Sequence, residues 1–152
     1  MLYTKDNFQE WIFYIGNKMD YFTEEFAKKN NLKLDYSIKS LDDIENWIIN
    51  NYNTINDLKE SNEVLDLITI YIGETFRKHI GGKWFMDIDN KDNAYYMMPV
   101  LTSPKYKGEL YKVPRTFATA CILRKKGNYI STILKNNMQK MSTAKNAVKS
   151  KK

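Results

Sequence analysis

The chain of 152 residues contains one histidine, His79, and one cysteine, Cys121. A nucleophile activated by an imidazole would have to use His79, and one residue of each type falls short of the usual four-ligand zinc set. His79 follows two cations near the end of a predicted helix, where positive charge complements the helix dipole. Cys121 stands among small apolar residues, which is typical of a buried thiol. Both residues are thus predicted to be structural, and no cofactor or metal is expected.

Glu74 is a further candidate, because this carboxylate interrupts an otherwise apolar stretch. A glutamate can act as a general acid or base, but no second catalytic carboxylate accompanies this one. An ion pair along the helix with Arg77 or Lys78 explains Glu74 more simply.

The segment Asp87-Ile88-Asp89-Asn90-Lys91-Asp92 superficially resembles a calcium-binding loop. Lys91 and Asp92 stand where an oxygen ligand and the turn glycine are needed, and Met98 replaces the bidentate glutamate. The segment is therefore predicted to be a turn between two strands.

Tyrosines alternate with cations between Pro104 and Arg115. Tyrosine rings can stack on unpaired bases while lysines meet phosphates, and tyrosine and arginine are also enriched at protein interfaces. The alternative is a solvated loop whose tyrosines pack on neighbouring strands. The candidate partner-binding residues are Tyr106, Lys107, Tyr111, Lys112 and Arg115.

The stretch from Ile70 to Trp84 combines the end of an apolar helix, two glycines and the start of a strand. Gly81 or Gly82 can adopt the left-handed conformation that ends a helix. Gly73 lies within the helix, where glycine costs about 1 kcal/mol relative to alanine. Close packing of Trp84 against Gly73 would explain that glycine, so the two are predicted to be structural neighbours.

The pattern Tyr71-x-Gly73-Glu74-x-x-Arg77-x-x-x-Gly81-Gly82-x-Trp84 resembles a signature of small bacterial proteins of unknown function. Some of these proteins look like immunity proteins encoded beside polymorphic or contact-dependent toxins. The resemblance implies a non-enzymatic protein that binds a cognate toxin. For the seven motif residues themselves, a structural role is expected.

The net charge of +6 divides unevenly along the chain. Residues 1–76 hold 7 Lys and 14 Asp or Glu (−7), whereas residues 77–152 hold 17 Lys or Arg and 4 Asp or Glu (+13). Such asymmetry indicates either attraction between two parts of the fold or a charged surface for a partner, and a solvated surface with a lysine-rich tail is the simpler alternative.

No apolar run approaches a membrane span, no secretory signal is evident, and a single cysteine suits a cytoplasmic protein.

Hydrophobic periodicity predicts one α+β domain over residues 1–141, followed by a basic flexible tail over 142–152. Apolar residues recur at helical spacing in a long N-terminal helix, at Phe8, Trp11, Ile12, Ile15, Met19, Phe22 and Phe26. Ser40 and Ser61 are predicted to begin two further helices, with a polar loop over 50–56 and a short strand or connector over 34–38. Strands over 84–88 and 95–101 form an antiparallel hairpin, and 102–113 is a loop. Helices then start at Pro114 and after Gly127-Asn128, although alternation over 116–123 would also fit a strand.

The leading hypothesis from the sequence is a non-enzymatic cytoplasmic protein of immunity type that occludes a cognate toxin. Nucleic-acid binding through residues 104–115 and the lysines at 145, 149, 151 and 152 is the first alternative. An enzyme using Glu74 or His79 in a cleft is the second alternative.

Overall fold

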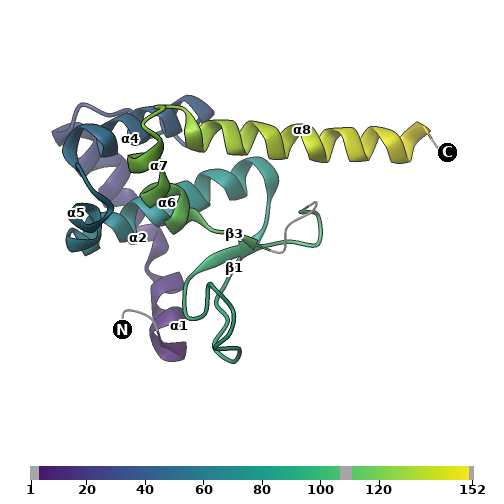
Figure 1. Cartoon of the computed structure of the whole chain (residues 1–152), viewed down its shortest axis with the longest axis horizontal. Coiled ribbons are helices and arrows are strands. Elements are labelled where there is room, and N and C mark those ends of the chain that lie inside the picture. The colour runs from purple at the N-terminus through teal and green to yellow at the C-terminus, as the bar shows by residue number, and fades with distance from the viewer. Residues whose placement is uncertain (1–3, 107–110, 151–152) are drawn as a thin grey trace.

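The computed structural model describes residues 4–106 and 111–150, with the backbone alone for Lys5 and residues 144–150. Helices gather around α6, and a small antiparallel sheet lies beside α1 (Figure 1). The predicted α+β class is confirmed. The helices are α1 (Lys5–Phe13), α2 (Ile15–Tyr21), the π-helical turn η1 (Phe22–Phe26), α3 (Ala27–Lys29), α4 (Ile38–Asn51), α5 (Ile55–Glu60), α6 (Asn62–Ile80), α7 (Pro114–Arg124) and α8 (Tyr129–Ser150).

Helix α6 is the centre of the core. Its apolar residues are buried on several sides of the helix, as expected of an element surrounded by others, and it packs against α2, α4, α5, α7 and α8. The fully buried apolar side chains of α6 are Leu65, Ile68, Ile70, Tyr71, Ile72 and Phe76.

The N-terminal helical segment is broken, whereas the sequence predicts one continuous helix. Tyr14 leaves the helical conformation between α1 and α2, at φ −90° and ψ 3°. A π-helical turn then follows α2, and its Phe22 and Phe26 rings stack in the core with centroids 4.7 Å apart. Ile12 was predicted to face inward but is 37% exposed.

The sheet is a three-stranded antiparallel meander of β1 (Lys83–Phe85), β2 (Val100–Thr102) and β3 (Tyr111–Lys112). Antiparallel pairing of the first two strands was predicted, but both strands are shorter than expected and residues 95–97 lie in a turn. The third strand lies within the predicted loop 102–113.

Several predicted boundaries are also corrected. Helix α4 begins after Ser37, whose hydroxyl accepts the Ser40 N–H, so Ser40 lies within the helix. Helix α5 starts at Ile55, inside the predicted polar loop, and residues 34–36 form a connector. Residues 114–124 are helical, which settles the alternative over 116–123 in favour of the helix. Helix α8 continues to Ser150, through most of the predicted tail, and projects from the rest of the fold (Figure 1).

Candidate functional site

Exposed apolar side chains concentrate on one stretch of the molecule. Among the described residues, six large hydrophobic side chains are exposed, and four of them lie between positions 12 and 21. Phe13 is the most exposed of these, at 77%, and its ring meets Tyr14 edge to face at a centroid distance of 5.1 Å. We call this surface the α1–α2 face, and its residues are Ile12, Phe13, Tyr14 and Tyr21.

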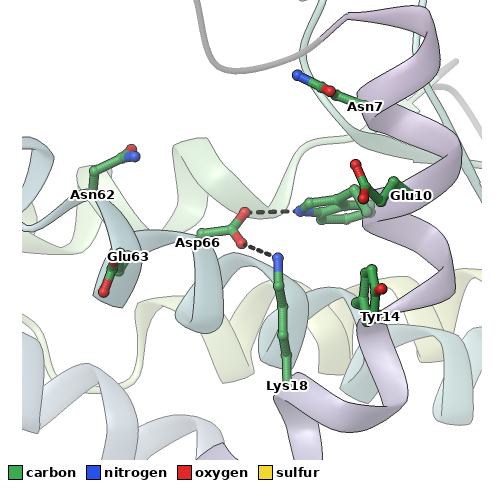
Figure 2. A pocket seen from close by; sticks show the side chains of 8 residues that line it. Asn7, Glu10, Tyr14, Lys18, Asn62, Glu63 and Asp66 are labelled. Atoms are coloured by element: carbon green, nitrogen blue, oxygen red, sulfur yellow. Dashed lines mark hydrogen bonds and ion pairs between the residues drawn. The ribbon is translucent and has the colours of Figure 1, made fainter.

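A groove of about 320 Å³, which combines aromatic rings with charged and amide side chains, borders the α1–α2 face. Figure 2 shows side chains from the α1–α2 segment on one side and from the start of α6 on the other. Tyr14 belongs to both the face and the groove, and the Phe13 ring lies against it, so Phe13 adjoins the groove. The groove residues are Asn7, Glu10, Trp11, Tyr14, Lys18, Asn62, Glu63 and Asp66.

Asp66 joins the two sides of this groove. Its Oδ1 atom accepts a hydrogen bond of 2.9 Å from Trp11 Nε1, and its Oδ2 atom lies 3.0 Å from Lys18 Nζ (Figure 2). The Lys18 and Asp66 side chains are 35% and 18% exposed, so the ion pair is only partly screened by water. These contacts fix the position of α1 and α2 relative to α6.

The groove has an excess of negative charge. Glu10, Glu63 and Asp66 contribute carboxylates, and Lys18 contributes the one ammonium group among the lining residues. Carboxylate oxygens accept hydrogen bonds and complement cationic groups on a partner. The groove can therefore bind lysine, arginine or amide groups, next to a face that can bury apolar side chains.

Trp11 connects this groove to the glycine-rich motif. Its indole meets Trp84 edge to face at a centroid distance of 4.9 Å. Trp84 in turn lies against Gly73, where an added Cβ atom would overlap the indole ring. The predicted proximity of Gly73 and Trp84 is confirmed, and this contact positions one wall of the groove.

The polar residues of the motif hold the turn between α6 and β1. Arg77 Nη1 lies 2.8 Å from Glu74 Oε2, and Arg77 Nε donates to the Gly82 carbonyl at 3.0 Å. The ion pair predicted for Glu74 is thus present. Gly81 and Gly82 have φ of +75° and +117°, a region that favours glycine.

Tyr71 anchors the connector that precedes α4. The side chain is fully buried. Its hydroxyl accepts the Tyr36 N–H at 2.9 Å and lies 2.6 Å from Ser40 Oγ. Burial raises the pKa of Tyr71, which keeps the hydroxyl protonated.

Two of the predicted partner-binding residues lie in the interior. Tyr106 is 7% exposed and donates to the Gly81 carbonyl at 2.7 Å, and burial raises its pKa to about 12. Lys112 is 1% exposed, with Nζ 5.3 Å from the Tyr106 ring centroid. Their side chains therefore offer little surface to a partner.

The other three predicted residues are placed differently. Tyr111 and Arg115 are half-buried, and Arg115 Nη1 is buried without a hydrogen-bond partner among the described residues. Lys107 lies outside the described residues. The alternation of tyrosine and lysine was interpreted as an exposed loop, but at Tyr111 and Lys112 it reflects the two faces of β3.

The candidate catalytic residues are separate from the groove. His79 is exposed, and its Nε2 atom lies 3.0 Å from the Tyr36 carbonyl oxygen. Cys121 is fully buried, as predicted, and burial raises the pKa of its thiol to about 12, with a smaller contribution from Glu45.

The Asp87 carboxylate accepts the N–H groups of Asn90 and Asp89, which lowers its pKa and stabilises the predicted turn.

Neither the α1–α2 face nor the contacts of Asp66 were predicted from the sequence. Phe13, Tyr14 and Tyr21 lie outside the apolar stripe of the predicted helix. These large apolar side chains outside the stripe were the signal that the sequence offered. Asp66 interrupts the apolar pattern of α6, but its partners lie 48 and 55 residues away in the chain. Only the folded arrangement shows that these positions meet.

Comparisons with family models, curated proteins and solved structures found no match to this chain. The resemblance to immunity-like proteins therefore stays a prediction. Within the described residues, no helix is long and apolar enough to cross a membrane. The same part of the chain contains no group of three or more His, Cys, Asp or Glu side chains that could hold a metal ion.

Proposed function

We propose that this chain is a non-enzymatic cytoplasmic binding protein of immunity type, which occludes a cognate toxin through the α1–α2 face and the adjoining groove. The observation that carries the proposal is the concentration of exposed apolar side chains between residues 12 and 21. Exposed apolar patches mark interaction sites, and aromatic residues contribute most to protein interfaces.

Charge supports a particular kind of partner surface. The groove contributes three carboxylates against one ammonium group, and residues 1–76 carry a charge of −7. An acidic rim beside apolar anchors accelerates association with a basic surface and disfavours acidic competitors. The partner we expect is thus a protein whose binding surface combines exposed lysine or arginine with an apolar pocket.

The resemblance of the Tyr71–Trp84 motif to immunity-like proteins agrees with this proposal. In the structure, the motif positions Trp84 and, through it, Trp11 at the groove. The motif would thus act by holding the binding surface in place.

Co-expression tests the proposal directly. The product of the gene beside this one should inhibit growth when expressed alone, and the intact chain should restore growth. A neighbouring product that is harmless, or whose toxicity persists in the presence of this chain, would contradict the immunity role.

A further inference from the structure

Helix α8 projects from the rest of the fold over much of its length (Figure 1). Its first turns pack into the core through Ile130 and Leu134, which are fully buried. The opposite side of the helix carries exposed residues at a spacing of i, i+1, i+4, i+5 and i+8, so these residues share one face. We call them the outer α8 face: Lys135, Asn136, Gln139, Lys140 and Thr143.

The sequence around the outer α8 face is basic. Residues 111–152 contain eleven Lys or Arg and no Asp or Glu. Lys125 and Lys126, which lie in the turn before α8, are both exposed. A surface of this composition attracts an anionic partner.

Carboxylates of α4, a helix that packs against α8, are engaged at the first turn of α8. The Ser131 hydroxyl donates a hydrogen bond to Asp42, and the N–H groups of Tyr129 and Ile130 donate to Glu45. The outer α8 face begins one turn further along the helix and carries two ammonium groups and no carboxylate.

The side chains of the outer α8 face favour one class of anionic partner. A helix that lies on a lipid surface exposes an apolar face, whereas this face is polar, and Met138 and Met141 pack against the core instead. Sites for single-stranded nucleic acid stack bases on aromatic rings, and protein interfaces rely on aromatic anchors, but none of the five residues is aromatic. Duplex DNA fits these residues better, because lysines neutralise its phosphates while asparagine and glutamine bond to base edges in the major groove.

The dimensions of α8 also fit this partner. An α-helix with its side chains is about 10–12 Å wide, and the major groove of B-form DNA is about 12 Å wide. At a rise of 1.5 Å per residue, the outer α8 face extends over about 12 Å from Lys135 to Thr143. Because the buried side chains lie on the opposite side of α8, the face can enter the groove while the core of the fold stays outside.

We propose that α8 binds duplex DNA by placing the outer α8 face in the major groove. Lys135 and Lys140 contact phosphates there, and Asn136 and Gln139 contact base edges. This site differs from the one predicted over residues 104–115, whose tyrosine and lysine side chains are partly buried in the fold. It is also independent of the α1–α2 face, so DNA binding and toxin binding can be tested separately.

Fluorescence anisotropy of the intact chain with a labelled DNA duplex of mixed sequence, at low salt, tests the proposal. Gln139→Glu places a carboxylate at the centre of the outer α8 face and should weaken binding at least tenfold. Glutamate and glutamine have similar helix propensities, so α8 should be retained. Gln9→Glu adds the same charge at an exposed position on α1 and should leave the affinity unchanged. Both variants should melt like the parent.

The salt dependence of binding measures the phosphate contacts. Each contact contributes about −0.9 to the slope of log K against log salt, so Lys135→Ala combined with Lys140→Ala should reduce the magnitude of the slope by about 1.8. Lys59→Ala combined with Lys91→Ala removes the same charge from exposed positions outside α8 and should leave the slope unchanged.

Competitors separate insertion into the major groove from simple charge attraction. An RNA duplex should compete poorly, because its deep and narrow major groove does not admit side chains. Vesicles of anionic lipid should also compete poorly. Absence of DNA binding at low salt, equal competition by the RNA duplex or the vesicles, or parental affinity in Gln139→Glu would each overturn the proposal.

Discussion

The contact between Gly73 and Trp84 couples the central helix to the wall of the groove. An added Cβ at Gly73 would overlap the Trp84 indole. Gly73→Ala should therefore destabilise the parent protein by about 1–3 kcal/mol, because the indole must move within a packed environment. Trp84→Ala should cost about 3 kcal/mol, the lower end for a large aromatic residue, since Trp84 is only half-buried.

The double variant provides the sharper test of this contact. Once Trp84 is alanine, the methyl group of Gly73→Ala has space, and the helix gains up to about 1 kcal/mol from the better helix former. Chemical denaturation of all four proteins should show Gly73→Ala changing from destabilising to stabilising. The same effect in both backgrounds would mean that the two residues do not interact energetically.

Buried tyrosines predict a loss of stability at alkaline pH. Burial raises the pKa of Tyr36 and of Tyr106 to about 12, from an ordinary value of 10.0. A raised pKa in the folded state means that the unfolded chain loses these protons first. Their contribution is complete well below pH 10 and is lost as pH rises towards about 12.

Denaturation midpoints measured on both sides of pH 10 would check this expectation. Ultraviolet absorbance of tyrosinate should show a group of tyrosines that ionises only as the protein unfolds. Tyr106→Phe should lose less stability than the parent over the alkaline range. Equal losses in the two proteins would contradict the assignment to Tyr106.

The structural roles of single residues could be predicted where the backbone conformation restricts which residue type fits. The cost of glycine inside a helix pointed to close packing at Gly73, and the double glycine pointed to a backbone with positive φ at Gly81. The interior positions of Tyr106 and Lys112 could not be predicted. Tyrosine and lysine carry both apolar and polar parts, so their alternation fits an exposed loop as well as a short strand.

At the scale of elements, a buried carboxylate anchors helix α8. Glu45 is fully buried on α4, and its two oxygens accept the backbone N–H groups of Tyr129 and Ile130 at 2.9 and 2.8 Å. These N–H groups belong to the first turn of α8, where no preceding helical carbonyl can accept them. A carboxylate at this end also complements the positive end of the helix dipole.

Glu45→Gln should therefore destabilise the protein by about 1–3 kcal/mol, because the amide keeps one acceptor and loses the charge. Hydrogen exchange at the Tyr129 and Ile130 amides should accelerate more than exchange in α6. Glu60→Gln, at an exposed position on α5, is the matched control and should change neither quantity. Unchanged exchange in Glu45→Gln would show that α8 is held by other contacts.

The elements themselves were predictable where the hydrophobic period was long. The period over 64–76 identified α6, and Pro114 correctly marked the start of α7. The interruption at Tyr14 was missed because the apolar spacing continues across it. The first two strands were predicted to be too long, because the alternation of side chains over 84–88 and 95–101 continues beyond the three residues that pair in each strand.

For the whole molecule, the α1–α2 face predicts a loss of toxin binding that is separable from any loss of stability. Phe13→Asp introduces a charge into the α1–α2 face at a position that is 77% exposed, so the fold should tolerate the change. Toxin binding should weaken at least 100-fold, as for a hot-spot residue that becomes buried in the complex. Leu123→Asp is the matched control, because Leu123 is 71% exposed on α7, away from α1 (Figure 1). Both variants should melt like the parent.

At this scale a charged or partner-binding surface could be predicted, but the position of the proposed α1–α2 face could not. The sequence indicated a charge asymmetry and a resemblance to immunity-like proteins, and it directed attention to residues 104–115. The α1–α2 face becomes visible only when the break at Tyr14 and the packing of Trp11 show which side chains remain outside.

The most direct measurement is titration calorimetry of the purified chain with the product of the neighbouring gene. The parent and Leu123→Asp should bind with equal affinity, and Phe13→Asp should bind at least 100-fold more weakly. Tight binding by folded Phe13→Asp, or no binding by the parent, would show that the α1–α2 face does not bind the toxin.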